Sequence, residues 1–205
     1  MNKIKLAIVL MFILLQSVAH ADAATNVASG KPVTLTGEFG TGSGYLDPSH
    51  LPPLPPASII TDGIFQGGYW TNGVWWDEQY TGIPSNVVVD LLGSFSLNNF
   101  SVMVDNNDMY LLEYRDPSGT WDPLWTIPDV CCFGLMERTL TLPLPITATA
   151  LRLSAFPPSH PGMDYAYSVS EIQASLVPEP ETYAMLLAGL GLLGFMARRR
   201  KESVV

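Results

Sequence analysis

The sequence predicts an all-β protein, a jelly-roll β-sandwich, and three observations support this fold class. Between the two chain ends no long segment has helical period; short β-branched or aromatic segments alternate with Gly, Pro, Asn and Asp. Several segments alternate apolar and polar residues, as expected for antiparallel sheets packed face to face. About eight such segments in roughly 150 residues is typical of a sandwich.

The expected strands run in order through the central part of the chain. They are Pro32–Thr36, Asn86–Leu92, Asn99–Asp105, Met109–Arg115, Trp121–Ile127, Glu137–Leu142, Ala148–Ala155 and Tyr167–Leu176. Phe100, Val102 and Val104 share one face, and Leu151 and Leu153 flank an outward-facing Arg152. We expect Asp90 to be a hydrogen-bonding residue of the sheet. The Gly-, Pro- and Ser-rich residues 38–56 and residues 156–164 are expected to form loops.

The N-terminus has the three parts of a secretory signal peptide. Lys3 and Lys5 precede an apolar stretch, 6–15, and Ala19-His20-Ala21 is a small-x-small cleavage site, with Ala21-Asp22-Ala23 as a second candidate. Residues 1–21 are therefore assigned to a signal peptide. A membrane anchor is the alternative, which the short apolar stretch and the cleavage site disfavour.

Residues 22–177 are left as one domain, long enough to bury a core. They hold 4 basic and 16 acidic side chains, a net charge of −12. So acidic a surface repels nucleic acid and anionic lipid, and this excludes nucleic-acid binding as a function.

The two cysteines of the chain, Cys131 and Cys132, are adjacent. In an oxidising exported compartment they can close a vicinal ring, pair with another chain, or stay reduced. They cannot cross-link distant strands, and no neighbouring His pattern indicates zinc.

The last 28 residues, 178–205, have a distinct layout. Pro178-Glu179-Pro180 precedes an uncharged apolar run, 182–197, and a basic cluster, 198–201, that contains Arg198, Arg199 and Arg200. As a helix the run spans about 24 Å, a little short of the ~30 Å hydrocarbon core, with the basic cluster on the cytoplasmic side. This layout resembles the PEP-CTERM sorting signal of Gram-negative bacteria. The resemblance implies a transient anchor in the inner membrane, processing by the membrane protease exosortase, and release to the cell surface or beyond.

The domain resembles discoidin domains, also called coagulation-factor type C domains, through a series of short landmarks in order. These are Asn26–Val33, Ala57–Gly63, Val87–Leu91, Tyr114–Trp121, Ala150–Leu153 and Val169–Ile172. The resemblance implies a galactose-binding-like jelly roll. One departure is Ser85-Asn86, where members often carry a tryptophan. Instead, Trp70, Trp75 and Trp76 crowd the preceding segment.

The candidate ligand-binding residues are Trp75, Trp76, Tyr80 and His160. The first three belong to an aromatic cluster with Tyr69 and Trp70 in a Gly-rich segment, and flat aromatic rings suit the apolar faces of sugars. Trp75 and Trp76 point opposite ways in an extended segment, so we expect one in the core and one exposed. The alternative is that the cluster plugs the sandwich. Trp70 and Trp121 are expected in the core.

Asp62 and Glu171 are the candidate metal ligands, because the resemblance implies that acidic positions of this kind help to hold a structural Ca²⁺. Carboxylate and carbonyl oxygens suit this ion, and carbonyls of residues 63–68 would have to complete the site. A turn-forming Asp and a surface Glu are the alternative.

The sequence offers little for catalysis. Neither His50 nor His160 lies in a nucleophile motif, and the Gly-x-Gly-x-x-Gly match at 189–194 lies inside the apolar run, where no strand precedes it. We therefore expect an exported, noncatalytic protein that binds carbohydrate, namely a polysaccharide of the extracellular matrix. The alternative is a structural or adhesive protein that binds another protein.

Overall fold

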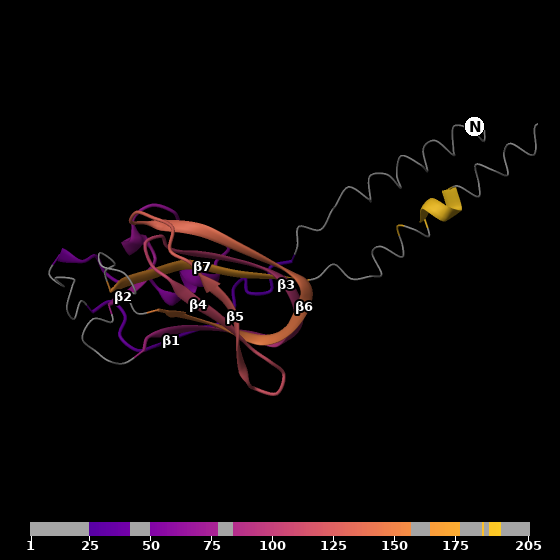
Figure 1. Ribbon diagram of the computed structural model, residues 1–205, viewed down its shortest axis with the longest axis horizontal. Helices are drawn as coiled ribbons and strands as arrows, with labels where there is room; N and C mark the ends of the chain where they lie inside the picture. The colour runs from indigo at the N-terminus through magenta and orange to yellow at the C-terminus, as the bar shows by residue number, and fades with distance from the viewer. Residues whose placement is uncertain are drawn as a thin grey trace, which may run out of the picture.

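The computed structural model describes residues 25–41, 50–77, 84–156, 165–176, 186 and 189–193, and it contains one antiparallel sheet that folds over on itself (Figure 1). The strand order is β2-β7-β3-β6-β4-β5, and β1 pairs with β3. The strands are β1 Val33–Thr36, β2 Val74–Asp77, β3 Asn86–Asp105, β4 Tyr110–Arg115, β5 Trp121–Ile127, β6 Leu135–Ala155 and β7 Ala166–Leu176. Two 3₁₀ turns, η2 Ala57–Thr61 and η3 Trp70–Asn72, precede β2.

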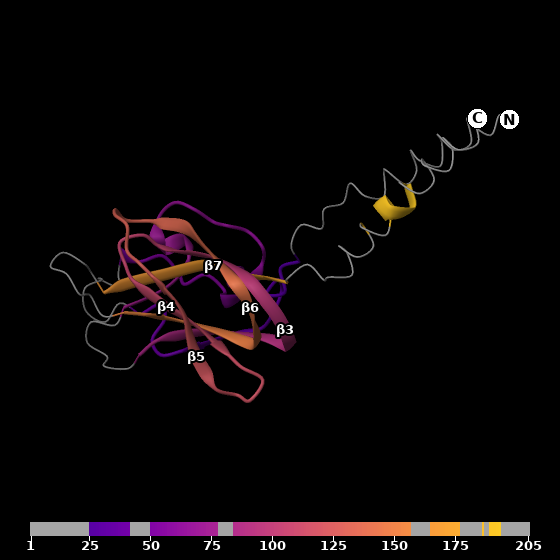
Figure 2. The same cartoon turned by 45° about the vertical axis from the view of Figure 1, so that its right-hand side comes forward.

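Two long strands, β3 and β6, carry the sheet from one layer of the sandwich to the other. The first part of β3 pairs with β1 and with the end of β6, and its second part pairs with β7 and with the start of β6. Between the two parts the register shifts twice, at Asp90/Phe95 and at Leu97/Asn99. Such irregularities bend a strand without ending it, and Figures 1 and 2 show both strands curving around one end of the domain.

This bend explains where the expected strands were wrong. Asn86–Leu92 and Asn99–Asp105 are two halves of β3, and Glu137–Leu142 and Ala148–Ala155 are two parts of β6. Residues with turn character fall between the halves, including Gly93 and Pro143, and they lie at the bulges rather than in separate loops. The opposite error concerns β2, a strand that is not among the expected ones.

The core follows the alternation read from the sequence. Phe100, Val102 and Val104 are buried together with Leu151 and Leu153, which confirms that these residues face inward. Residues from both layers meet in one large cluster, so the two layers of the sandwich share the main hydrophobic core.

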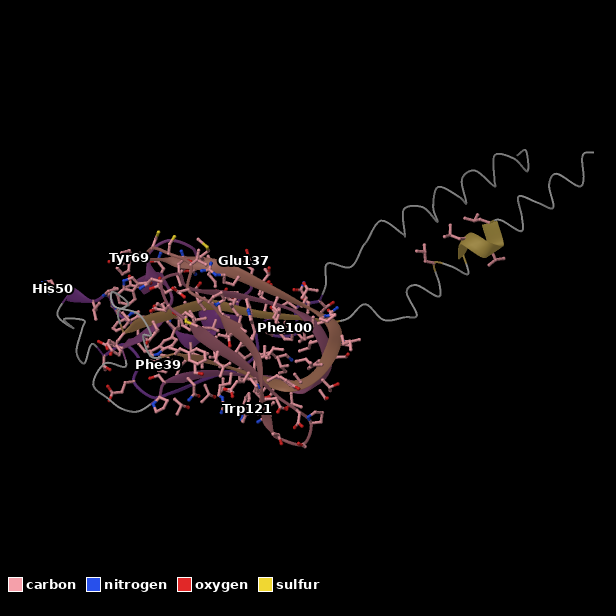
Figure 3. All side chains as sticks on the ribbon, in the orientation of Figure 1. Phe39, His50, Tyr69, Phe100, Trp121 and Glu137 are labelled. Atoms are coloured by element: carbon pink, nitrogen blue, oxygen red, sulfur yellow. The ribbon has the colours of Figure 1, made fainter. Side chains whose placement is uncertain are left out.

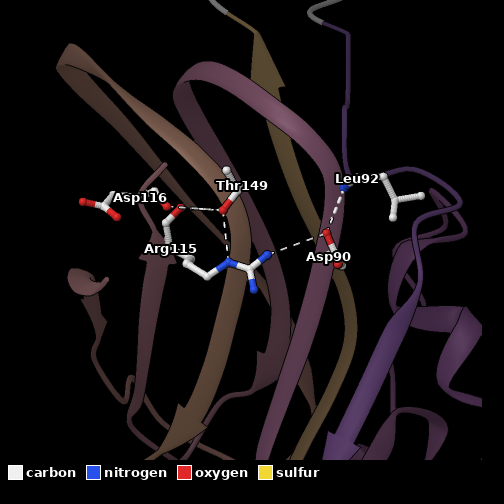
Figure 4. Close-up of polar contacts among 5 residues, drawn as sticks. All are labelled: Asp90, Leu92, Arg115, Asp116 and Thr149. Atoms are coloured by element: carbon white, nitrogen blue, oxygen red, sulfur yellow. Dashed lines mark hydrogen bonds and ion pairs between the residues drawn. The ribbon is translucent and has the colours of Figure 1, made fainter. Parts of the chain in front are cut away.

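The bend is supported by polar contacts of Asp90, shown in Figure 4. Its Oδ1 atom accepts a hydrogen bond of 2.9 Å from the backbone N–H of Leu92 and lies 3.9 Å from Nη2 of Arg115. Arg115 also donates from Nε to Oγ1 of Thr149 at 3.0 Å. The structural role expected for Asp90 is confirmed.

The two ends of the folded domain lie together at the bend. Asn26 forms a bridge with Ser175, and Ser175 pairs with Asn99 just beyond the bend of β3. The signal peptide 1–21, the motif Pro178–Pro180 and the cluster Arg198–Arg200 lie outside the described residues. Within the part of the chain that the structure describes, no helix has the length and apolar character needed to cross a bilayer.

Candidate functional site

The end of the sandwich away from the bend is called the loop end, defined by residues 62–69, 106–109 and 128–134. Asp105 and Leu135, where β3 ends and β6 begins, pair at this end. Leu135 donates its N–H to the carbonyl of Gly68 at 2.9 Å, and Val130 donates to Asn106 at 2.9 Å. These hydrogen bonds join the three loops into one surface.

Two large aromatic side chains project from the loop end. Tyr69 is 63% exposed and Phe133 is 66% exposed. Tyr69 follows Gly68, and Phe133 precedes Gly134. The backbones of these two glycines lie in close contact, because a Cβ added to Gly134 would lie 2.6 Å from the carbonyl oxygen of Gly68. Figure 3 shows Tyr69 on the surface at this end of the domain. Both rings are exposed on loops that hydrogen-bond to each other, and exposed apolar surface of this kind often marks a binding site.

Trp75 and Trp76 do not belong to this exposed surface. They are 1% and 0% exposed, so the expectation that one of them faces solvent is wrong. The alternation was read correctly, because the two indoles lie on opposite faces of β2, but both faces are covered. Trp76 packs in the main core against Phe39 and Tyr167, with ring centroids 5.2 and 5.7 Å away.

Trp75 lies in a second, smaller cluster outside the main core. It meets the ring of Trp70 edge-on, with the centroids 5.8 Å apart, and Ala166, Leu51 and Leu54 complete the cluster. Trp70 is buried, as expected. Part of the proline-rich stretch 50–56, expected to be a surface loop, thus covers Trp75. Two further candidates, Tyr80 and His160, lie outside the described residues.

Asp62 and Glu171, the candidate metal ligands, are brought together although 108 residues separate Gly63 from Glu171. Gly63 donates its N–H to Oε2 of Glu171 at 3.2 Å, and Ile64 donates to Oδ1 of Asp62 at 2.8 Å. Asp62 is exposed at the end of η2, whereas the side chain of Glu171 on β7 is buried.

The buried carboxyl of Glu171 has an abnormal protonation equilibrium. Burial raises its pKa to about 7, and the nearby negative charge of Asp62 adds to this rise, whereas hydrogen bonds from the side chain of Gln173 and from the backbone N–H of Gly63 oppose it. Its Oε1 atom is buried and has no hydrogen-bond partner within the described ranges. An unpartnered carboxylate oxygen beside a second carboxylate can accommodate a hard cation. Among the described residues, no group of three or more His, Cys, Asp or Glu could hold a metal, so carbonyl oxygens would have to contribute.

Trp121 lies on the outer face of the sheet, and the expectation of a core position was wrong. It pairs with Arg115, whose side chain faces outward, so Trp121 shares that face. The guanidinium of Arg152 lies 4.4 Å from the Trp121 ring centroid and makes two hydrogen bonds to Glu113, of 2.6 and 2.8 Å. The outer face of the sheet therefore carries charged side chains that already interact with one another and with the Trp121 ring.

Phe133 and its neighbour Val130 are site residues that the sequence reasoning did not single out. The signal was present, because Val130-Cys131-Cys132-Phe133 is a run of apolar or weakly polar residues between two strands, in a position where loops are usually polar.

A family model described as the PEP-CTERM protein-sorting motif matches residues 176–201. The chain carries a PEP-CTERM sorting motif at its C-terminus. This confirms the resemblance drawn from the Pro-Glu-Pro motif, the apolar run and the arginine cluster. A sorting motif of this kind implies export and processing at the membrane. No curated protein matches the sequence.

The sandwich resembles solved carbohydrate-binding modules of family 32. The module from Streptococcus pneumoniae EndoD is 14% identical, with 75% of this chain and 100% of that chain covered, at a TM-score of 0.51. The module from Clostridium perfringens NanJ, solved with galactose, is 17% identical, with 73% and 97% covered, at a TM-score of 0.48. The likeness to the Streptococcus module establishes the fold, a discoidin-like, galactose-binding-like β-sandwich, as expected.

Proposed function

We propose that this protein is an exported, noncatalytic carbohydrate-binding protein whose sandwich binds a polysaccharide of the extracellular matrix through the loop end. The observation that carries the proposal is the pair of exposed rings, Tyr69 and Phe133, held on hydrogen-bonded loops. Aromatic rings present flat apolar faces that complement the C–H faces of sugars. The shared fold with a family 32 carbohydrate-binding module supports the same function.

The position of the loop end supports binding at a distance from the membrane. Ser175, next to the sorting motif, pairs with Asn99, whereas the loop end begins at Asp105 of the same strand. Six residues of an extended strand separate these points by about 20 Å. A chain held by its C-terminal segment would therefore keep Tyr69 and Phe133 away from the point of attachment.

The proposal is tested by glycan-array binding with the exported, processed protein, followed by calorimetric titration of the glycan that gives the strongest signal. Tyr69→Ala and Phe133→Ala should each weaken binding by about 1–3 kcal/mol, as expected when an aromatic anchor is lost. Both side chains are exposed, so the melting temperature should change little.

Leu144→Ala is the matched control, because Leu144 is a large exposed apolar side chain of β6 at the bend, away from the loop end. It should leave glycan affinity unchanged. A blank array together with a protein partner recovered in pull-downs would instead favour a structural or adhesive function.

A structural calcium ion is part of the proposal. Glu171 and Asp62 would hold it, and it would supply the positive charge that the buried carboxylate of Glu171 lacks. The ion would then fix the loop that follows η2 against β7, where Ser170 already donates a hydrogen bond of 3.1 Å to the carbonyl of Gln66.

The sorting motif implies a second partner, a membrane protease of the exosortase type. We propose that export proceeds in three steps. Residues 182–197 form a transient inner-membrane anchor, the chain is cleaved near Pro178–Pro180, and the domain is released to the surface. Leu190, Leu192 and Leu193, which are described and helical, are all exposed, in keeping with a helix that packs against lipid rather than against the domain.

A further inference from the structure

The loop 128–134 carries a feature that carbohydrate binding does not require, namely the adjacent thiols of Cys131 and Cys132. Both are exposed, and their Sγ atoms lie only 2.7 Å apart. We propose that Cys131 and Cys132 close a vicinal disulfide in the exported protein, which makes this loop a site of oxidative modification.

The backbone of the loop brings the two sulfur atoms together. Cys132 has a φ of 63°, one of two positive values at non-glycine residues in the described chain. A side chain with a Cβ rarely adopts this conformation unless its surroundings impose it. Here the left-handed conformation turns two successive side chains, which would diverge in an extended strand, toward the same side.

The surroundings that impose this conformation are the residues at the end of β3. Val130 donates its N–H to the carbonyl of Asn106 at 2.9 Å, and Gly134 donates to Oδ1 of Asp105 at 2.7 Å. Between these two points the side-chain amide of Asn106 donates to the carbonyl of Cys131. The loop is thus held at both ends and at its centre, and the thiols have little freedom to separate.

The chemical setting favours oxidation. The sorting motif at residues 176–201 implies export, and disulfides form and persist in exported compartments. Neither cysteine has another disulfide partner in this chain, because the sequence contains only these two cysteines. A disulfide oxidant accepts two electrons: the two S–H bonds are lost, one Sγ–Sγ bond forms, and the oxidant leaves as two thiols after passing through a mixed disulfide.

The disulfide ring would lie between two exposed side chains of the same loop. Val130 and Phe133 flank the cysteines. Just after this loop, the backbone N–H of Leu135 donates a hydrogen bond to the carbonyl of Gly68, next to Tyr69. Closing the ring removes two polar S–H groups and fixes the loop. Because the two Cα atoms are closer than disulfides normally allow, the bond should be reduced more readily than a disulfide between distant strands.

The test uses the full chain, with its signal peptide, exported in a Gram-negative host and alkylated with iodoacetamide before any reductant is added. Intact mass should be two hydrogen atoms below that of the reduced chain, with no alkylated cysteine, and the protein should be a monomer on a non-reducing gel. After reduction, two alkyl groups per chain should be incorporated. Tandem mass spectrometry should find both cysteines in one internally linked peptide.

Two results would overturn the proposal: two alkylated thiols per chain without reduction, or a dimer that reduction dissolves. Cys131→Ser and Cys132→Ser are the matched controls, and each should leave one cysteine that either alkylates or pairs between chains. As a second measurement, the reduced protein is incubated with excess oxidised glutathione. Loss of both free thiols in the monomer supports the ring, and a stable mixed disulfide with glutathione contradicts it.

Discussion

At the scale of single residues, the carboxyl group of Glu171 lies in an environment very different from water. It is buried on β7, and its Oε1 atom has no hydrogen-bond partner in the described part of the chain. Its pKa is raised to about 7, with burial as the main cause. In the unfolded chain a glutamate titrates near pH 4.3. Folding therefore favours the protonated form.

The raised pKa of Glu171 predicts that this residue makes the protein less stable as the pH rises from about 4.5 to 7. In that window the unfolded chain releases the proton and the folded chain keeps it. The loss should reach about 3–4 kcal/mol and level off above pH 7, since raising a pKa by one corresponds to about 1.4 kcal/mol. Urea unfolding of the wild type and of Glu171→Gln at several pH values measures the difference. Parallel curves would contradict the prediction.

Calcium should reverse this dependence if the ion binds between Glu171 and Asp62. A cation stabilises the carboxylate, and an ion that binds only the folded state raises stability by mass action. After chelator treatment, millimolar calcium should raise the melting temperature more at pH 8 than at pH 5. Asp62→Ala should abolish the rise. An unchanged melting temperature at both pH values would argue against the ion.

The two adjacent tryptophans of β2 should behave alike. Trp75→Ala and Trp76→Ala each remove a large side chain that is at most 1% exposed, and should destabilise the fold by about 3–5 kcal/mol. Chemical denaturation measures this loss. Trp121→Ala on the outer face is the control and should cost less, because that ring is only partly buried. A variant of either buried tryptophan that keeps full stability but loses glycan affinity would restore a ligand role.

The sequence predicted the directions of these side chains better than their exposure. Period-2 alternation placed Trp75 and Trp76 on opposite faces, which is a local property of an extended backbone. Whether a face is covered depends on distant segments: Leu51 and Leu54 cover Trp75, and Tyr110 and Tyr167 surround Trp76. Such contacts leave no periodic signal. The pairing of Asp62 with Glu171 came from the family resemblance, and the structure places them together.

At the scale of elements, the decisive feature is that β3 and β6 continue through a bend. Leu92 lies at this bend with a φ of 56° and an exposed side chain, and its N–H donates to Asp90. The left-handed conformation costs a residue with a Cβ about 1–2 kcal/mol. The hydrogen bond to Asp90 helps to hold Leu92 in this conformation.

Leu92→Gly should therefore stabilise the protein. Glycine removes the steric cost, and the greater freedom of the unfolded chain, worth about 0.5–1 kcal/mol, offsets only part of the gain. We expect a net gain of up to about 1 kcal/mol in the free energy of unfolding, measured by denaturant titration. Leu144→Gly is the matched control, since Leu144 is also exposed and lies in β6 at the bend but has no positive φ. It should destabilise. A loss of stability in both variants would show that the backbone of Leu92 is not strained.

The strands away from the bend could be predicted closely from the sequence, and the bend could not. β4 and β5 begin and end within one residue of the expected ranges, because alternation and a tight turn at 116–120 define them locally. Gly93, Pro143 and Pro145 are breakers of regular strands, so the sequence alone predicts breaks between strands at these positions. A bulge accommodates the same residues without ending the strand, and only the register of the partner distinguishes the two outcomes.

At the scale of the whole molecule, the two ends of the domain and the exposed rings lie at opposite ends of the sandwich. Both ends of the domain leave at the bend (Figure 1), where Asn26 bridges Ser175. The exposed side chains of Tyr69 and Phe133 belong to the loop end, and Figure 3 labels Tyr69 there. The last strand, β7, ends at Leu176, whose N–H bonds to the carbonyl of Thr25 at 3.2 Å. The Pro-Glu-Pro motif begins two residues later, so cleavage there would remove no residue of the sheet.

Processing should therefore change where the protein resides but not how it folds or binds. In a host with exosortase, the intact mass of the mature protein should correspond to a chain without Arg198–Lys201. In a host without it, the full C-terminus should remain. Because every hydrogen bond of β7 is retained after a cut near Pro178–Pro180, the processed and unprocessed proteins should have equal melting temperatures and equal glycan affinity. Mature protein that still carries Arg198–Lys201 in the exosortase host would contradict the processing step. A lower melting temperature after cleavage would show instead that residues beyond Leu176 contribute to the fold.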